Sequence, residues 1–359
     1  MKHAIRAGLA AATALSMAGM AAPTAAQSAA QSVHAVAGVP LEMEPRSCDR
    51  ACLESYVERY LQAMSDGVVA DDLFARNVRF TENGVQLPLG NEGLWATTVS
   101  PQGYRLIVPD VVTGQVAALV TVKEQAGTSA TGAMRDPEAV GISLRLRIDR
   151  EGRISEAEQV VARPDRPLGA ASGPSSDPFP ATGAAVEAIG SPWPGYLRAV
   201  PEGERHSRAE LVEYANAYFE AVERNTTRDF YPFSEDCLRL ENGMIAAASD
   251  AERAALPDRP AFGSVQTCRG QFETSLVGTV TSVRDRRVVA VDQERGVVFA
   301  FAFFDHRPIN WTWQLGELFK VEGGLITRIE AIFIRGPYGI CSGWSTYEQC
   351  RSEEVMDVR

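Results

Sequence analysis

The stretch DRACLESYVERYL (residues 49–61) returns as SRAELVEYANAYF (residues 207–219), and this pair decides the fold. Arg, Ala, Leu and both Tyr match at an offset of 158. Further along, Glu-Asn-Gly at 82–84 returns at 241–243, and residues 152–158 return as 324–330. Three matches in the same order indicate one unit written twice. The unequal offsets predict a longer middle in the second copy.

Each copy is predicted to begin with an amphipathic helix. Apolar side chains recur at helical spacing in both copies: Leu53, Tyr56, Val57, Tyr60, Leu61 and Met64, then Leu211, Ala215, Tyr218, Phe219 and Val222. Asp49 and Ser207 are expected to be the N-caps, since their side chains accept bonds from free N–H groups. Each repeat therefore opens with a helix that buries one face.

Strands are predicted to follow the helix in each copy. In the first copy they cover residues 76–90, 104–124 and 140–163, with turns at Asn83-Gly84, 113–114 and 151–152. In the second copy they cover residues 287–305 and 311–335, with turns at 294–296 and 322–324. A helix followed by a curved antiparallel sheet, twice, predicts an α+β protein of two cone-shaped domains.

The composition bounds the function classes. The length of 359 residues suggests two domains. The net charge of −11 argues against binding to nucleic acid. Six cysteines are an even number, and we expect the neighbours to pair: Cys48–Cys52, Cys237–Cys268 and Cys341–Cys350. Six cysteines allow 15 connectivities, so the sequence alone leaves other pairings open.

The N-terminus is interpreted as a secretory signal peptide over residues 1–26. Lys2 and Arg6 precede an apolar stretch over 7–22, and Thr24-Ala25-Ala26 is typical of a cleavage site. The alternative is a membrane anchor, but the stretch is shorter than the ~20 residues that a span needs. The prediction is a periplasmic or secreted protein with no stable membrane insertion.

The rest of the chain is divided by composition. We expect a disordered leader (27–44), a first domain (45–163), a linker (164–200), a second domain (201–340) and a disulfide-closed tail (341–359). The linker holds 7 of the 20 prolines. Trp193 and Tyr196, near its end, are expected to dock on a domain surface; the alternative is a lid over a pocket.

Three segments resemble the nuclear transport factor 2-like superfamily, also called SnoaL-like or ketosteroid-isomerase-like: ERYLQAMSDG (58–67) its first helix, NVRFTE (77–82) its first long strand and DREGRI (149–154) its closing hairpin. The tandem form with a Cys-x-x-x-Cys motif, a doubled Glu-Asn-Gly and a leader also resembles a poorly characterised group of secreted fungal and bacterial proteins. The resemblance implies sheet-to-sheet pairing, here as an intramolecular pseudo-dimer in a monomer or as a homo-oligomer.

The resemblance also implies a catalytic tyrosine and carboxylate in each copy: Tyr60 with Glu82, and Tyr218 with Glu241. A carboxylate in an apolar cone is a stronger base, and a buried tyrosine can donate to an enolate oxygen. Ketosteroid isomerase is the worked example of this principle. In the alternative interpretation, Glu-Asn-Gly only builds a turn and the tyrosines are core residues.

Two departures from that pattern concern the residues around the carboxylates. The isomerase also needs a second, protonated acid, and the matching positions are Leu144 and Gly316; Glu317 would serve if the register shifts by one. By alternation, Glu82 lies with Val78 and Phe80 toward an apolar interior. Glu241 lies with Arg239 and Cys237, opposite Leu238 and Leu240. We therefore expect a desolvated base in the first copy and an ion-paired carboxylate in the second.

Asp305 and His306 form a further candidate acid–base pair, at the end of an apolar strand; the alternative is that they are turn residues. No cofactor and no metal ligand set is predicted. Two functions remain open: a cofactor-independent lyase, isomerase or hydrolase that acts on a small apolar carbonyl compound, or a non-catalytic module that binds a small molecule or a partner.

Overall fold

A computed structural model describes residues 48–359 except 126, 129–131, 165–178, 180, 225–230, 275–278 and 347–349. Contacts divide the chain into residues 1–44 and residues 45–359, and all described residues belong to the second unit. The predicted signal peptide, the leader and most of the Pro-rich part of the linker lie outside the described residues. No helix within the described ranges is long and apolar enough to cross a membrane.

The first sheet has six strands and is packed against a long helix, α1 (Arg50–Asp66). Its order is β2-β1-β6-β5-β4-β3. The strands are β1 (Phe74–Glu82), β2 (Val85–Gln86), β3 (Thr98–Asp110), β4 (Gln115–Glu124), β5 (Glu138–Ile148) and β6 (Ile154–Ala162). The predicted helix, strands and turns of the first copy are confirmed, and Asp49 caps α1 by accepting from Cys52 N.

The second sheet repeats this plan with α4 (Arg208–Arg224) and adds strands at both edges. Its order is β14-β10-β11-β12-β13-β7-β8-β9. The strands are β7 (Phe233–Glu241), β8 (Met244–Ala247), β9 (Ala261–Gln266), β10 (Ser282–Asp292), β11 (Val297–His306), β12 (Trp311–Glu322), β13 (Leu325–Pro337) and β14 (Met356–Asp357). Ser207 caps α4, and Glu210 bonds back to Ser207 N as a capping box.

The strand directions in both sheets differ from the prediction. Each sheet is mixed, rather than wholly antiparallel. β1 pairs with β6, and β7 with β13, in parallel. Hairpins join the other long strands and make them antiparallel. The two strands of each parallel pair are far apart in the sequence, so no hairpin joins them and they can run in the same direction. The longer middle of the second copy holds α5 (Asp250–Ala255), β9 and α6 (Cys268–Thr274).

The linker is also partly helical, with α2 (Thr182–Glu187) and α3 (Pro194–Leu197), and Tyr196 is buried as expected. Trp193 lies under Arg328, whose guanidinium carbon is 4.5 Å from the ring centre. Single-turn helices complete the elements: η1 (Gly93–Ala96), η2 (Glu202–Glu204) and η3 (Arg307–Ile309).

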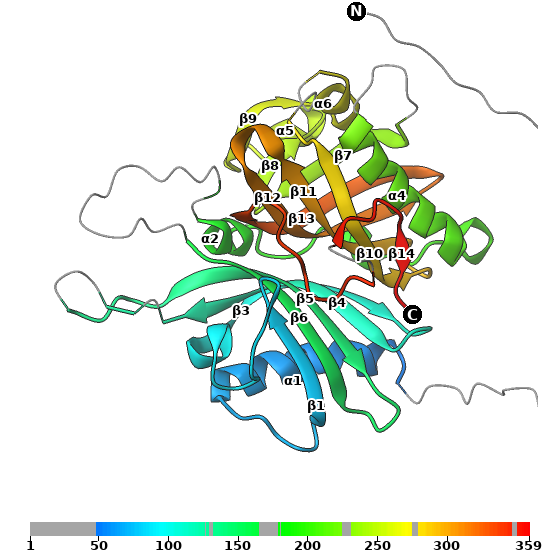
Figure 1. Cartoon of the computed structure of the whole chain (residues 1–359). Coiled ribbons are helices and arrows are strands. Elements are labelled where there is room, and N and C mark those ends of the chain that lie inside the picture. The colour runs from blue at the N-terminus through cyan, green and yellow to red at the C-terminus, as the bar shows by residue number, and fades with distance from the viewer. Residues whose placement is uncertain are drawn as a thin grey trace, which may run out of the picture. The chain divides into compact units, whose positions relative to one another are not determined.

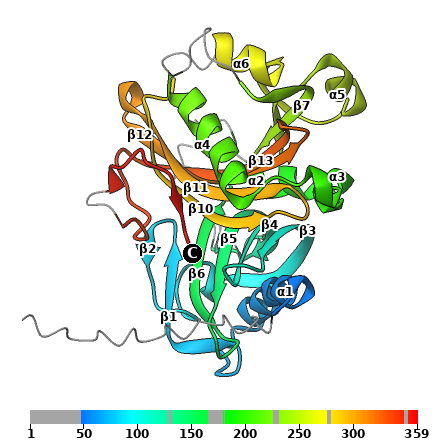
Figure 2. The same ribbon diagram turned by 90° about the vertical axis from the view of Figure 1, so that its right-hand side faces the viewer.

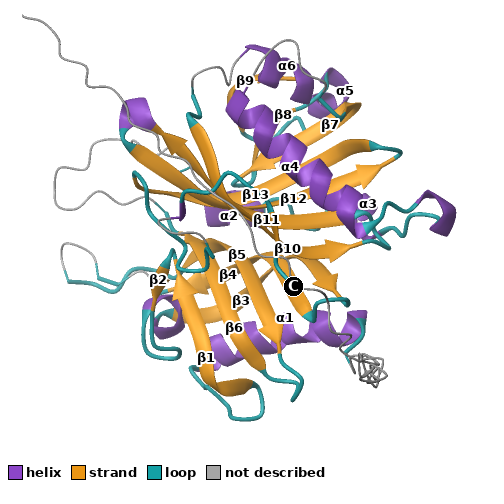
Figure 3. Ribbon diagram, turned by 45° about the vertical axis from the view of Figure 1, so that its right-hand side comes forward, coloured by secondary structure: helices purple, strands orange, loops and turns teal. Residues whose placement is uncertain are grey.

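The two sheets face each other, and α1 and α4 cover their opposite faces (Figures 1 and 3). The central strands are therefore buried on both sides, which explains the unbroken apolar run of β11. Val298, Ala300 and Phe304 point to the α4 side, whereas Phe299 and Phe301 pack into the core between the sheets. α+β architecture with two sheets is thus confirmed.

Buried polar contacts also cross between the sheets. Glu158 on β6 accepts two bonds from Arg287 on β10, at 2.9 and 2.8 Å. In the other direction, the Tyr104 hydroxyl on β3 donates to Glu330 on β13. Equivalent strands thus exchange contacts in both directions.

The C-terminal tail contacts both sheets, and its end lies beside β10 (Figure 2). Trp344 donates its indole N–H to the hydroxyl of Thr81 on β1 at 2.7 Å, and Arg79 covers its ring at 4.1 Å from the centre. The carbonyl of Val358 accepts from Gln115 on β4 at 2.6 Å. All three predicted disulfides are confirmed.

Candidate functional site

The two Glu-Asn-Gly segments build hairpin turns, as the simpler interpretation expects. Asn83 and Asn242 have φ values of 51° and 49°, and the glycines that follow also have positive φ, as type I′ turns require. Each asparagine amide also clamps the last strand of its copy. Asn83 bonds the backbone of Val161, and Asn242 bonds that of Phe333. The repeat therefore fixes where both glutamates end up.

In the first copy, an amide links the predicted tyrosine and carboxylate. The Tyr60 hydroxyl donates to Gln159 Oε1 at 3.1 Å, and Gln159 Nε2 donates to Glu82 at 3.0 Å. Glu82 also accepts from Leu94 N at 2.7 Å and pairs with Arg163 at 2.7 Å. Glu82 is buried, as expected of a desolvated carboxylate, but three donors hold it.

In the second copy, the tyrosine contacts a carboxylate directly, but the partner is Glu317. The Tyr218 hydroxyl and Glu317 Oε1 are 2.8 Å apart. Glu241 instead pairs with Arg239, as expected for an ion-paired carboxylate. Arg239 lies 3.9 Å from Glu317 and covers the Tyr218 ring at 5.5 Å from its centre.

Strand register explains why Glu317 occupies the acid position. Leu144, Gln159 and Glu82 form one row across β5, β6 and β1. The corresponding row across β12, β13 and β7 is Glu317, Ala331 and Glu241. Gly316 faces the first sheet instead, where an added Cβ would press on Ser143. The structure therefore has the register shift of one residue that places Glu317, rather than Gly316, in this row.

The expectation that Glu82 and Glu241 lie on different faces of their strands is wrong. Cys237 belongs to the core under α4, and Arg239 and Glu241 share its face, so Glu241 is directed to the helix side just as Glu82 is. Leu238 and Leu240 form a second apolar cluster on the opposite face. Because both faces of β7 are covered, alternation alone could not tell which face is the core.

Burial sets the protonation of the second-copy cluster. It raises the pKa of Glu317 to about 8, against the lowering effect of Arg239 and with a further increase from Glu241. It also raises the pKa of Tyr218 well above its ordinary value. Glu317 is thus mostly protonated at neutral pH. It can therefore donate a proton.

Asp305 and His306 are not brought together as a pair. Arg284 binds the Asp305 carboxylate through two nitrogens, at 2.8 and 3.1 Å, and Thr312 also donates to it. The His306 ring contacts Thr279 O through Nδ1 at 2.8 Å. Successive side chains of a strand point to opposite faces, which explains the separation. Burial lowers the pKa of His306.

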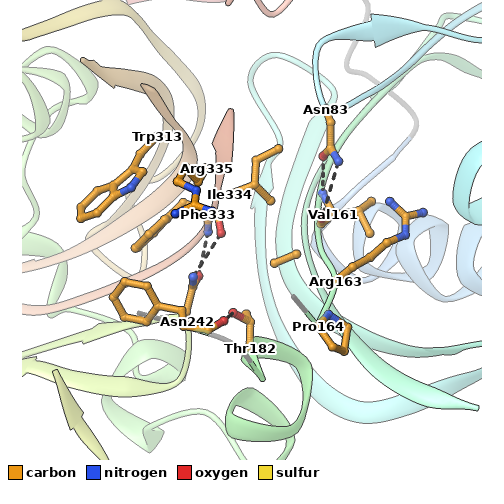
Figure 4. A pocket seen from close by; sticks show the side chains of 12 residues that line it. Asn83, Val161, Arg163, Pro164, Thr182, Asn242, Trp313, Phe333, Ile334 and Arg335 are labelled. Carbon is orange, nitrogen blue, oxygen red and sulfur yellow. Dashed lines mark hydrogen bonds between the residues drawn. The ribbon is translucent and has the colours of Figure 1, made fainter. Parts of the chain in front are cut away.

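A cleft of about 230 Å³ lies between the two copies, and equivalent residues line both of its walls (Figure 4). Asn83 faces Asn242 across it, and residues 161–163 of β6 and its end face residues 333–335 of β13. The remaining lining residues are Pro164, Phe179, Thr182 and Trp313. Among the described residues of the lining, apolar side chains are combined with two guanidinium groups, Arg163 and Arg335, and with no carboxylate.

The Arg163 guanidinium is directed away from the middle of this cleft (Figure 4). It is bound there by Glu82 and by Glu124, the latter at 2.9 Å. The first-copy cluster therefore lies directly behind one wall of the cleft, and Arg163 joins the two.

Sequence reasoning missed several of these residues. Arg163 directly follows β6 and Arg335 lies near the end of β13, at the offset of 172, so the repeat carried a signal for them. Gln159 carried none, because its role depends on strand register. Gly93 was missed too; its φ is +59° and an added Cβ would collide with Glu82. Among the described residues, no group of three His, Cys, Asp or Glu could hold a metal ion.

Replacement of Glu317 by Gln is expected to change how stability depends on pH. A carboxyl whose folded pKa lies above its ordinary value of 4.5 costs stability as the pH rises toward about 8, because only the unfolded chain ionises freely. Glutamine cannot ionise. Urea unfolding should therefore show that the free energy of unfolding of the variant increases relative to that of the wild type as the pH rises through this range. A constant difference would contradict a protonated Glu317.

The fold and site define the class as an α+β protein of two similar sheets with a cleft of about 230 Å³ between them. Residues 204–333, which hold most of the second copy, match a protein family described as a domain of unknown function (DUF8021). No curated protein matches the chain.

Proposed function

We propose that this protein is a non-catalytic binding module, and that its ligand is a small, mainly apolar carbonyl compound held in the cleft between the copies. The observation that carries the proposal is the paired lining. Both walls come from the same positions of the repeat, and together they enclose about 230 Å³. Pockets for drug-sized ligands have about 300–1,000 Å³, so a smaller molecule suits this one.

The chemistry of the lining supports such a ligand. The side-chain amides of Asn83 and Asn242 are engaged with the strand backbone, and Val161, Phe333 and Trp313 supply apolar surface. This apolar surface supports a small, mainly apolar ligand.

We further infer that the chain is an exported tandem nuclear transport factor 2-like protein whose two cones form an intramolecular pseudo-dimer. In support, the sheets bury a shared core and exchange Glu158–Arg287 and Tyr104–Glu330 in opposite directions. Self-complementary contacts of this kind are typical of twofold interfaces. Three disulfides are consistent with an oxidising compartment.

A thermal-shift screen of metabolite pools on the mature protein tests the binding. A ligand at about 100 times its Kd stabilises by about 2.7 kcal/mol. Ile334→Trp fills the cleft and should abolish the shift, whereas Tyr60→Phe, in the first-copy core, should retain it. A ligand whose thermal shift is retained in Ile334→Trp but lost in Tyr60→Phe would place the binding site inside a cone instead.

A second candidate function is a cofactor-independent lyase or isomerase. The Tyr218–Glu317 contact and the pKa of about 8 for Glu317 favour it, since an acid near neutrality suits proton transfer. For a compound that the protein turns over, Glu317→Gln should then reduce kcat by about 10²–10⁴-fold. Glu82→Gln serves as the comparison, and unchanged turnover in both variants would exclude these carboxylates.

A further inference from the structure

Two glutamates at equivalent positions of the repeat reach across to the opposite sheet with different chemistry. Glu158 and Glu330 are separated by the repeat offset of 172, and only 1% and 3% of them is exposed. Two guanidinium groups face Glu158: Arg287 at 2.8 Å and Arg145 at 3.8 Å. Glu330 instead accepts from a phenol, the hydroxyl of Tyr104. One crossing contact is ionic, and the other is not.

The groups around Glu330 offset little of a negative charge. Tyr104 faces it from β3 and Tyr196 from α3, and Arg259, which follows α5, acts on it electrostatically. Arg259 donates to the backbone carbonyls of Ala185, Gly243 and Ala188.

The strands beside Glu330 add no charge at its register. Its partners on β7 and β12 are Leu240 and Leu318. On β13 itself, Arg328 is engaged with Glu252 and with the carbonyl of Asp236. Burial raises the pKa of Glu330 to about 7, and the Tyr104 bond and Arg259 limit the increase.

We propose that the buried Tyr104–Glu330 pair is a pH-sensitive fastener between the two sheets: the closed arrangement is favoured while the Glu330 carboxyl is neutral and disfavoured when the buried carboxyl loses its proton. The sign follows from burial, because separating the sheets lets water reach the carboxylate and so favours its ionised form. Rising pH therefore favours opening. The Glu158–Arg287 contact, by contrast, joins two groups of opposite charge.

Hydrogen exchange of the full mature chain tests the fastener at about pH 6 and about pH 8, with intrinsic exchange rates divided out. The readout is the opening of β3 and β13, with α1 as the internal reference. In the wild type the opening constant should increase about tenfold, since each pH unit of a single titration changes an equilibrium up to tenfold. A wild type without this increase overturns the proposal before any variant is made.

Three variants separate the fastener from a merely structural contact. Glu330→Gln should abolish the pH response, and Tyr104→Phe should steepen it, because the phenol stabilises the ionised carboxyl. Glu317→Gln removes a second buried acid of raised pKa, which lies under α4, and should leave the response of β3 unchanged. A wild-type response in Glu330→Gln, or its loss in Glu317→Gln, would overturn the proposal.

Discussion

Replacement of Arg287 by Met is expected to lower the free energy of unfolding by about 3–5 kcal/mol. Glu158 has 1% of its side chain exposed and accepts both Arg287 bonds, so the variant leaves a buried carboxylate with only Arg145, at 3.8 Å. A charge without its hydrogen-bonded partner retains its full desolvation cost. Urea unfolding followed by circular dichroism measures the loss.

Two controls make this result specific to the buried pair. The double variant Glu158→Leu with Arg287→Met removes both charges of the pair and should recover part of the lost stability, because apolar replacements of buried ion pairs are often neutral. The loss that remains comes from buried Asp285, which Arg287 also binds at 3.2 Å. Arg198→Met breaks a surface pair with Glu322, where 63% of the arginine side chain is exposed, and should cost less than about 1 kcal/mol. An Arg287→Met loss as small as that would contradict a buried crossing pair.

Removal of the Cys237–Cys268 disulfide, by replacement of both cysteines with Ala, is expected to cost about 3–4 kcal/mol. The bond joins β7 to the start of α6 across a separation of 31 residues, and a longer closed loop loses more unfolded-state entropy. Both sulfur atoms are also in the second core, which adds lost packing. Thermal unfolding of the oxidised proteins would show the difference.

The Cys48–Cys52 bond is the matched control, since it closes only 4 residues and should contribute about 2 kcal/mol or less. The longer bond also bears on the candidate site. Phe272 of α6 packs against the Tyr218 ring at 5.5 Å between centres, so loosening α6 should admit water to Glu317. Equal losses from both double replacements would contradict the loop-length argument.

The sequence by itself determined the repeat, and with it the elements of both copies. Period-3.6 patterns marked α1 and α4, and Asn-Gly, Glu-Gly and Gly-Gly turns marked the hairpins, because these signals depend only on nearby residues. The disulfide pairs followed from proximity along the chain. The repeat also placed Glu82 and Glu241 on equivalent strands. In each copy an Asn-Gly turn follows the glutamate, and its asparagine bonds the backbone of the last strand.

Only the tertiary structure decided which groups these carboxylates meet. Glu82 meets Arg163, Gln159 and Leu94 N because β6 and η1 pack beside β1, and the acid beside Tyr218 is Glu317 because register sets its row. A shift of one residue turns a strand's side chains to the other face, and local patterning cannot detect it when both faces are buried. For the same reason, the cleft and the crossing contacts of Glu158 and Glu330 emerge only when the two sheets face each other.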